Sequence, residues 1–282
     1  MRQKGLTLIE LLIAMTMTGI LGAGIYRTFV GQQHTYQVQE DIVDVQQNAR
    51  MAITQMVRDI RMAGFGRVDS KTFGASGMHG KYKNIVTPGN STVTIVAAYQ
   101  QVTTLAADAG SGLDTITVTD ASSFTTSGAK QYICINGTES HRVKKINGNQ
   151  IQFFNDGNDT GTLVDSHYTG EPVFLVKAIS YSLGVSDGKV CVLRDENLGD
   201  GPQPVAENIE SIQFVYTVRE DDGSLAVYDG NMPGNKRDKI RMVQVKIVAI
   251  ADRRDPDLMK ASDGYRRRVL TSEIQLRNLL GT

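Results

Sequence analysis

Glu10 is the first residue whose chemistry stands out, because it is the single charged residue in the apolar run from Leu6 to Tyr26. As a helix this run is about 31 Å long at ~1.5 Å per residue, close to the bilayer core of about 30 Å. An acidic side chain within a membrane span costs roughly 2.5–3.5 kcal/mol on insertion scales. Either Glu10 lies near the cytoplasmic end and is partly hydrated, or it pairs with a cation inside the membrane.

Two basic residues, Arg2 and Lys4, precede the apolar run. The positive-inside rule therefore keeps residues 1–5 in the cytoplasm and sends the chain after Arg27 across the membrane. A cleaved secretory signal is the alternative, with Gly22-Ala23-Gly24 as the small-residue cleavage site. The apolar run is longer than the ~7–15 residues of such a signal, which favours an anchor.

The two cysteines are the next candidates for chemistry. Cys134 and Cys191 fall on two predicted strands of the part of the chain that is translocated. An oxidising compartment favours a disulfide, and closing a loop of this length contributes roughly 4 kcal/mol in the chain-entropy model. We predict that disulfide, with two unpaired core thiols as the alternative.

One short segment begins like a calcium-binding loop: Asp156, Asn158, Thr160 and Gly161 have the right spacing. The twelfth position of the loop is His167, where such loops have Glu. We therefore expect no metal there, and a bound calcium ion is the alternative.

Two basic runs, Arg253-Arg254 and Arg266 to Arg268, lie among aspartates near the C-terminus. This mixture of charges is typical of a solvated loop with local ion pairs. A patch that contacts DNA is the alternative, but it lacks interleaved aromatic residues, since only Tyr265 is close.

The composition argues against several functional classes. The chain has 282 residues with 30 basic and 30 acidic side chains, so it lacks the excess positive charge of a DNA-coating protein. It contains no phosphate-binding loop, no H-E-x-x-H and no Cys-x-x-Cys pattern, and residues 74–77 fail the spacing of a nucleophile elbow. We predict no catalytic residue, no cofactor, no metal site and no small-molecule substrate.

The segment from Lys4 to Leu12, KGLTLIELL, resembles the prepilin signal of type IV pilins and pseudopilins. The resemblance implies that prepilin peptidase cuts between Gly5 and Leu6 and methylates the new amine of Leu6. It also implies that Glu10 neutralises the terminal amine of a neighbouring subunit during assembly. The family usually has Phe where this chain has Leu6; both are apolar, so we expect processing to survive.

The elements that position these residues begin with one long helix. Apolar residues recur at spacings of three and four from Val38 to Ala63, no proline interrupts residues 6–63, and Gly64 and Gly66 supply a stop signal. We predict a helix over 6–63, about 87 Å long at the standard rise. Residues 6–30 form its membrane-spanning half and residues 31–63 its amphipathic half, after a leader at 1–5.

Residues 64–282 form the second part of the chain, a translocated head with short β-type runs separated by Gly, Asn and Asp. We predict an α+β fold, in which the upper half of the helix packs on an antiparallel β-rich head. A low-complexity stretch near residue 106 and separate hairpin signals indicate a β insertion at about 105–170. The expected strands lie at residues 92–99, 114–119, 131–136, 140–146, 150–154, 173–183, 189–194, 209–218, 239–251 and 267–276.

Three further segments resemble PilW-type minor pilins: Arg58 to Phe65, Val205 to Phe214 and Glu273 to Asn278; the last two also resemble GspJ-type secretion pseudopilins. The resemblance implies a lollipop-shaped minor pilin that helps to initiate or cap a type IV pilus. Its partners are then prepilin peptidase, other minor pilins, the major pilin and, before assembly, the inner membrane. It sits in that membrane with the head in the periplasm and later near the pilus tip.

Two other functions remain open at this point. One is a minor pseudopilin of a type II secretion system, which the sequence barely separates from a pilus subunit. The other is a membrane-anchored periplasmic binding domain or enzyme with an uncleaved anchor, which would keep residues 1–5.

Overall fold

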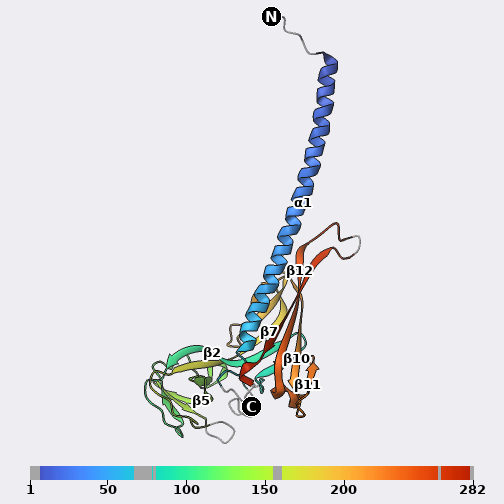
Figure 1. Ribbon diagram of the computed structural model, residues 1–282. Helices are drawn as coiled ribbons and strands as arrows, with labels where there is room; N and C mark the ends of the chain where they lie inside the picture. The colour runs from blue at the N-terminus through green and yellow to red at the C-terminus, as the bar shows by residue number, and fades with distance from the viewer. Residues whose placement is uncertain (1–6, 67–77, 79–80, 155–160, 260–261, 280–282) are drawn as a thin grey trace. The chain divides into compact units, whose positions relative to one another are not determined.

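The structure is a computed structural model, and it describes residues 7–66, 78, 81–154, 161–259 and 262–279 (Figure 1). These residues form one α-helix, thirteen β-strands and three short 3₁₀-helices, η1 Gly128–Lys130, η2 Gly234–Lys239 and η3 Arg277–Leu279. The predicted α+β class, with a long N-terminal helix followed by an antiparallel β-rich region, is confirmed.

Helix α1 runs without interruption from Leu8 to Arg61, 54 residues in all. It ends two residues before the predicted Ala63, just ahead of the predicted stop signal, in which Gly64 and Gly66 adopt φ angles of +75° and +96° that L side chains rarely adopt. Gly66 is required for a second reason: a Cβ atom there would lie 2.8 Å from Sγ of Cys134.

The predicted apolar stripe of α1 is buried in its C-terminal half. Residues 7–33 are all exposed, whereas the small and apolar side chains that follow at helical spacing are at most 3% exposed. The buried members are Val45, Ala49, Ala52, Met56 and Ile60. The small side chains of Ala49 and Ala52 let the helix approach its neighbours closely.

The larger sheet has nine strands, and every neighbouring pair in it is antiparallel. Its central path is β1-β2-β7-β4-β5-β6-β3, and β8 pairs with both β7 and β9. The bounds are β1 Val86–Pro88, β2 Val93–Thr104, β3 Thr115–Thr117, β4 Tyr132–Ile135, β5 Glu139–Asn147, β6 Gln150–Phe153, β7 Pro172–Ser186, β8 Lys189–Asp195 and β9 Gln203–Glu207.

The smaller sheet has four strands in the order β11-β10-β12-β13. Their bounds are β10 Ile209–Arg219, β11 Leu225–Tyr228, β12 Ile240–Arg254 and β13 Tyr265–Gln275. Strand β12 alternates as its sequence predicts, since the buried residues Val243, Val245, Ile247 and Ala249 face one side. Every predicted strand is present, and the short strands β1, β9 and β11 are additional. Each has three to five residues, too few for a clear alternating pattern.

Buried side chains from described residues between 105 and 163 form one hydrophobic cluster with the first residues of β7. The cluster combines side chains of β3, β4, β5 and β6 with those of the connecting loops, and Val173 and Leu175 of β7 complete it. This is the segment that the sequence suggests as an insertion, and its core is continuous with the longest strand of the large sheet.

The predicted disulfide is wrong, because Cys134 and Cys191 are buried, free thiols. Cys134 of β4 pairs in register with Phe174 of β7, and Cys191 of β8 with Gly184 of the same strand. Those positions on β7 are about 30 Å apart at ~3.3 Å per residue, far beyond the Cα separation of about 7 Å that a disulfide tolerates. The sequence identified two strands but not their register. Burial raises the pKa of the Cys134 thiol to about 11, so the thiol is unreactive.

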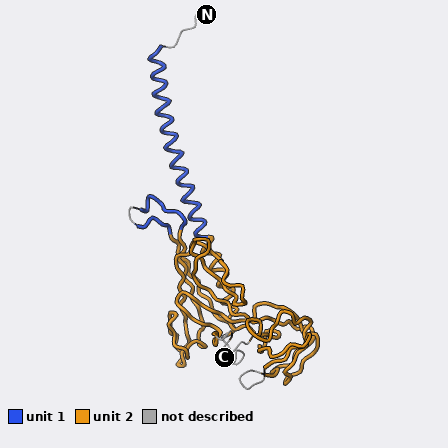
Figure 2. Tube along the Cα trace, turned by 180° about the vertical axis from the view of Figure 1, so that it is seen from behind, with its two compact units in different colours: residues 1–46, 251–266 blue, residues 47–250, 267–282 orange. Residues whose placement is uncertain are grey.

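The chain divides into two compact units (Figure 2). Unit 1 comprises residues 1–46 and 251–266, which include the first part of α1, the end of β12, the start of β13 and the segment that links these two strands. Unit 2 comprises residues 47–250 and 267–282.

Within unit 2, the buried carboxylate of Asp59 fastens the last turn of α1 to the large sheet. Its Oδ2 atom accepts hydrogen bonds from the Tyr181 hydroxyl of β7 at 2.5 Å and from Nε of Arg194 of β8 at 2.7 Å. The Tyr99 hydroxyl of β2 donates to the backbone carbonyl of Asp59 at 2.9 Å. Burial, followed by the charge of Asp59, raises the pKa of Tyr181 well above 10, so this phenol stays a donor.

We predict that Asp59→Ala lowers the free energy of unfolding of the head by about 3 kcal/mol, because Arg194 and Tyr181 lose their shared acceptor. Urea denaturation of the full chain in detergent, followed by circular dichroism of the β structure, measures this loss. Asp44→Ala, at an exposed aspartate of the same helix, is the matched control and should change stability by less than about 0.5 kcal/mol. Equal effects of the two substitutions would contradict the anchoring role of Asp59.

Candidate functional site

The first candidate site is the N-terminal part of α1, whose apolar surface nothing in the described chain covers. Its large side chains from Leu8 to Phe29 are 52–79% exposed. An 18-residue window of this helix has a mean hydropathy of 1.9 and no buried residue, so α1 is long and apolar enough to cross a membrane. A continuous apolar surface of this kind requires a membrane or other apolar helices around it.

The threonine hydroxyls in this segment form hydrogen bonds within the helix itself. The hydroxyls of Thr16, Thr18 and Thr28 donate to backbone carbonyls three or four residues earlier, at 2.8–3.0 Å. The helix therefore presents no free hydroxyl donor at these positions. This is what an apolar environment demands, because an unsatisfied polar group there is costly.

Glu10 has a local structural role that the sequence analysis did not assign to it. The backbone amide and the hydroxyl of Thr7 donate to Oε2 of Glu10 at 2.9 and 2.8 Å. In return, the Glu10 amide approaches Oγ1 of Thr7 at 3.4 Å. This is a capping box, and the Thr-x-x-Glu spacing at the start of an apolar helix was the signal that identifies it.

The capping box uses one oxygen of the Glu10 carboxylate. Among the described residues, no donor reaches Oε1, so this oxygen is available to a partner outside them. The predicted cleavage and methylation positions, Gly5 and Leu6, lie outside the described residues and stay predictions.

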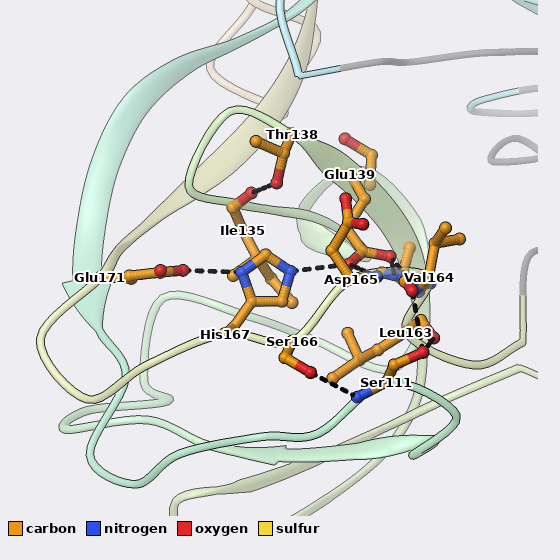
Figure 3. Close-up of polar contacts among 12 residues, drawn as sticks. Ser111, Ile135, Thr138, Glu139, Leu163, Val164, Asp165, Ser166, His167 and Glu171 are labelled. Carbon is orange, nitrogen blue, oxygen red and sulfur yellow. Dashed lines mark hydrogen bonds and ion pairs between the residues drawn. The ribbon is translucent and has the colours of Figure 1, made fainter.

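The second candidate is a cluster of titratable side chains in the head, shown in Figure 3. Nε2 of His167 lies 2.6 Å from Oε1 of Glu139, and its Nδ1 lies 2.6 Å from Oε2 of Glu171. Nε2 of His141 lies 3.0 Å from Oε2 of Glu139. Glu139, His141 and His167 are all buried.

Backbone amides complete the contacts of the Glu139 carboxylate. Val164 donates to Oε2 at 2.8 Å and Asp165 to Oε1 at 3.2 Å. Glu139 belongs to β5, so these bonds hold the loop around Val164 and Asp165 on that strand.

The charges of this cluster follow from its contacts. Burial alone would raise the pKa of Glu139, but hydrogen bonds from His141, the Val164 amide and His167 outweigh it and lower the pKa to about 2. Burial alone would lower the pKa of His167, but the hydrogen bonds to Glu171 and Glu139 raise it above 6.5. Ionised carboxylates only accept hydrogen bonds, so both ring nitrogens of His167 must donate in this geometry, which is the imidazolium form that the raised pKa favours.

The cluster is suited to hold the loop and not to perform catalysis. A catalytic acid or base must reach a substrate, whereas Glu139 and His167 are buried and already hydrogen-bonded to each other. Sequence analysis did not find this cluster, because its two segments, residues 139–141 and 164–171, are separated along the chain and only the folded structure brings them together.

His167 is also the residue that ends the predicted calcium-like loop. In the structure it is committed to Glu139 and Glu171. Three of the four residues that suggest this loop, Asp156, Asn158 and Thr160, lie outside the described residues.

The basic runs near the C-terminus form local ion pairs, as predicted. Arg266 pairs with Asp255, and both Nε and Nη2 of Arg267 lie 2.7 Å from the carboxylate of Glu210. The guanidinium of Arg254 lies over the ring of Tyr265, 5.2 Å from its centroid. The ion pairs confirm that part of the prediction, but the predicted loop is wrong, because Arg253 and Arg254 end β12 and Arg266 to Arg268 lie near the start of β13.

Comparisons with known proteins give one match within the sequence. Residues 1–26 match the family described as the prokaryotic N-terminal methylation motif, which confirms the predicted prepilin-type signal. No curated protein matches the chain.

Among solved structures, the chain is similar to a type IV-like pilin from Thermus thermophilus. The two share 11% sequence identity and a TM-score of 0.33, over 83% of this chain and 97% of that chain. A likeness at this level adds nothing to what the helix and the sheets show by themselves.

We predict that the stability of the head falls on both sides of a window between about pH 4.5 and 6.5. Because the pKa of His167 is raised in the folded state, protonated His167 stabilises the head fully below about pH 6.5. This stabilisation is lost as the pH rises through the folded-state pKa. Because the pKa of Glu139 is lowered in the folded state, ionised Glu139 stabilises the head fully above about pH 4.5. This stabilisation is lost as the pH falls toward 2. Melting temperatures of the full chain in detergent from pH 3 to 9 measure both limbs.

His167→Gln isolates the alkaline limb of this profile. We expect the variant to lose about 2–3 kcal/mol at pH 6, because Glu139 and Glu171 lose a charged partner. We also expect its stability to vary little between pH 6 and 9. An unchanged alkaline slope in His167→Gln would show that another group causes it.

Proposed function

We propose that this chain is a non-enzymatic, pilin-type structural subunit that assembles into a filament through its N-terminal helix. The observation that carries the proposal is that residues 1–26 match the methylation motif and that α1, which begins at Leu8 within this motif, has an uncovered apolar surface. A processing signal next to such a helix serves a protein that first waits in a membrane and then packs with similar helices.

The proposed sequence of events uses three residues. Prepilin peptidase cuts the peptide bond between Gly5 and Leu6 and methylates the new amine of Leu6. The apolar helix stays in the inner membrane, with the head in the periplasm, until assembly. Glu10 then pairs with the terminal amine of a neighbouring subunit, and its Oε1 atom can accept that contact while Oε2 keeps the capping box with Thr7.

The energetic reason for the Glu10 pair is the cost of an isolated charge. A lone carboxylate or a lone amine within an apolar bundle is unfavourable, and pairing removes most of the penalty for both. The pair thus selects a helix register in which each Glu10 meets an amine. This selection explains why a charge is retained in an otherwise apolar span.

We further propose that the subunit is a minor pilin of the PilW type, placed at or near the pilus tip. Support comes from the size of the β-rich region, which has two sheets and thirteen strands among the described residues. A bulky head is easier to accommodate at one end of a filament than at every step of its shaft. Its partners are then the major pilin and other minor pilins.

A minor pseudopilin of a type II secretion system is the second candidate, since the same motif and helix would serve it. A deletion strain separates the two. Loss of surface pili and twitching with normal secretion supports the pilus subunit, and the reverse result supports the pseudopilin.

We predict that the native protein begins with N-methyl-Leu6 in cells that contain prepilin peptidase and with Met1 in cells that lack it. Mass spectrometry of the N-terminal peptide gives the result. A chain that keeps Met1 in both strains, or one cut near Gly24, would exclude the filament subunit and favour a membrane-anchored periplasmic domain or a secreted protein.

We predict that Glu10→Gln is cleaved normally but enters filaments at least about tenfold less often than the wild type, the ratio that ~1.4 kcal/mol of lost pairing gives. Glutamine can still form the capping box, so this variant removes the charge and keeps the helix start. Quantitative immunoblotting of purified filaments and of the membrane fraction measures incorporation.

Glu40→Gln is the matched control, because Glu40 is an exposed acidic residue of the same helix beyond the apolar run. It should be incorporated like the wild type. Normal incorporation of Glu10→Gln would refute the proposed role of the Glu10 charge while leaving the processing of the N-terminus intact.

A further inference from the structure

One group of side chains in unit 1 has the composition of a metal site. His34 of α1 and Asp255 and Asp257 of the segment after β12 each offer a ligand atom, and these atoms all lie within 4.8 Å of one another. The sequence separates His34 widely from the two aspartates, so only the fold brings the three together.

The spacing between His34 and Asp255 differs from that of the other histidine–carboxylate contacts described above. Nε2 of His34 lies 3.7 Å from Oδ1 of Asp255, whereas the contacts of His141 and His167 are 2.6–3.0 Å long. A separation of 3.7 Å is too long for a hydrogen bond. It is close to the ~3.4 Å between two ligand atoms that share a tetrahedral ion with bonds of about 2.1 Å.

The Asp255 carboxylate is held in position by the protein. Its side chain is 4% exposed, its Oδ2 atom contacts the guanidinium of Arg266, and its Oδ1 atom accepts the Asp257 amide at 2.9 Å. The Asp255 amide donates to the carbonyl of Gly264 at 2.7 Å. Outer contacts of this kind orient a carboxylate toward an ion and reduce the cost of ordering it.

The remaining ligand atoms are accessible from solvent. The His34 side chain is 40% exposed and Asp257 is exposed, so an ion can reach the group from outside. Two carboxylates and one imidazole carry a charge of −2 when the imidazole is neutral, and Arg266 offsets only one of these charges. The remaining charge of −1 favours the binding of a cation.

We propose that His34, Asp255 and Asp257 bind one divalent transition-metal ion of the Zn²⁺ type, with water completing its coordination. One imidazole nitrogen and two carboxylate oxygens are ligands that suit such an ion. The ion cross-links α1 to the segment that joins β12 to β13. This inference does not depend on the filament function, because the three ligands belong to a single chain.

Zinc binding to the full chain tests the proposal. The protein is purified in detergent without a histidine tag, stripped with chelator and titrated with ZnCl₂ by isothermal titration calorimetry. We expect one site per chain, and we expect His34→Ala and Asp257→Asn each to weaken binding at least about tenfold. Co²⁺ added in place of Zn²⁺ should give visible absorption bands that His34→Ala abolishes.

Two variants serve as controls. Asp252→Asn removes an exposed aspartate near the end of β12 that is not part of the group, and His79→Ala removes a histidine outside the described residues. Both should bind Zn²⁺ like the wild type. Absence of binding by the wild type, equal binding by His34→Ala and Asp257→Asn, or loss of binding in His79→Ala would each overturn the proposal.

Discussion

The buried carboxylate of Asp59 is the interaction on which the described fold of unit 2 depends most. A tyrosine or an arginine from each of three strands of the large sheet, β2, β7 and β8, donates a hydrogen bond to this one residue in the last turn of α1. A negative charge at this depth is tolerable only because Tyr181 and Arg194 both donate to it. Arg194 is in turn held by Glu196, which also receives Lys177, so the charge is spread over a short network.

The first part of the helix follows the opposite rule. There the chain keeps polar atoms off the surface instead of burying a charge, since threonine hydroxyls bond to the preceding turn and no charged residue other than Glu10 occurs up to Tyr26. Glu10 itself has a local partner in Thr7. The N-terminal part of α1 therefore requires an apolar environment that the described chain does not supply. The C-terminal part is anchored through Asp59 to strands of the same chain.

The head relies on a third arrangement, in which an imidazolium lies between two carboxylates. His167 contacts Glu139 and Glu171, and Glu139 also accepts two backbone amides from the adjoining loop. Such a network fixes a loop in one conformation because any displacement leaves several charges unpaired at once. This cluster of His167, Glu139 and Glu171 therefore stabilises the conformation of the loop.

What the sequence determined by itself is local. The sequence alone predicts the elements that arise from local patterns: the apolar run with Glu10, the stripe from Val38 to Ala63, the glycines after it and the alternation of β12. These patterns can be recognised because the periodicity of a helix or strand appears in consecutive residues. Contacts between distant segments were decided by the tertiary structure alone. The separation of Cys134 from Cys191 depends on the register of two strands along β7. The meeting of His167 with Glu139, and that of His34 with Asp255, depend on how loops close over strands and helices. Register and loop closure are set by the packing of the whole core, which no short stretch of sequence contains.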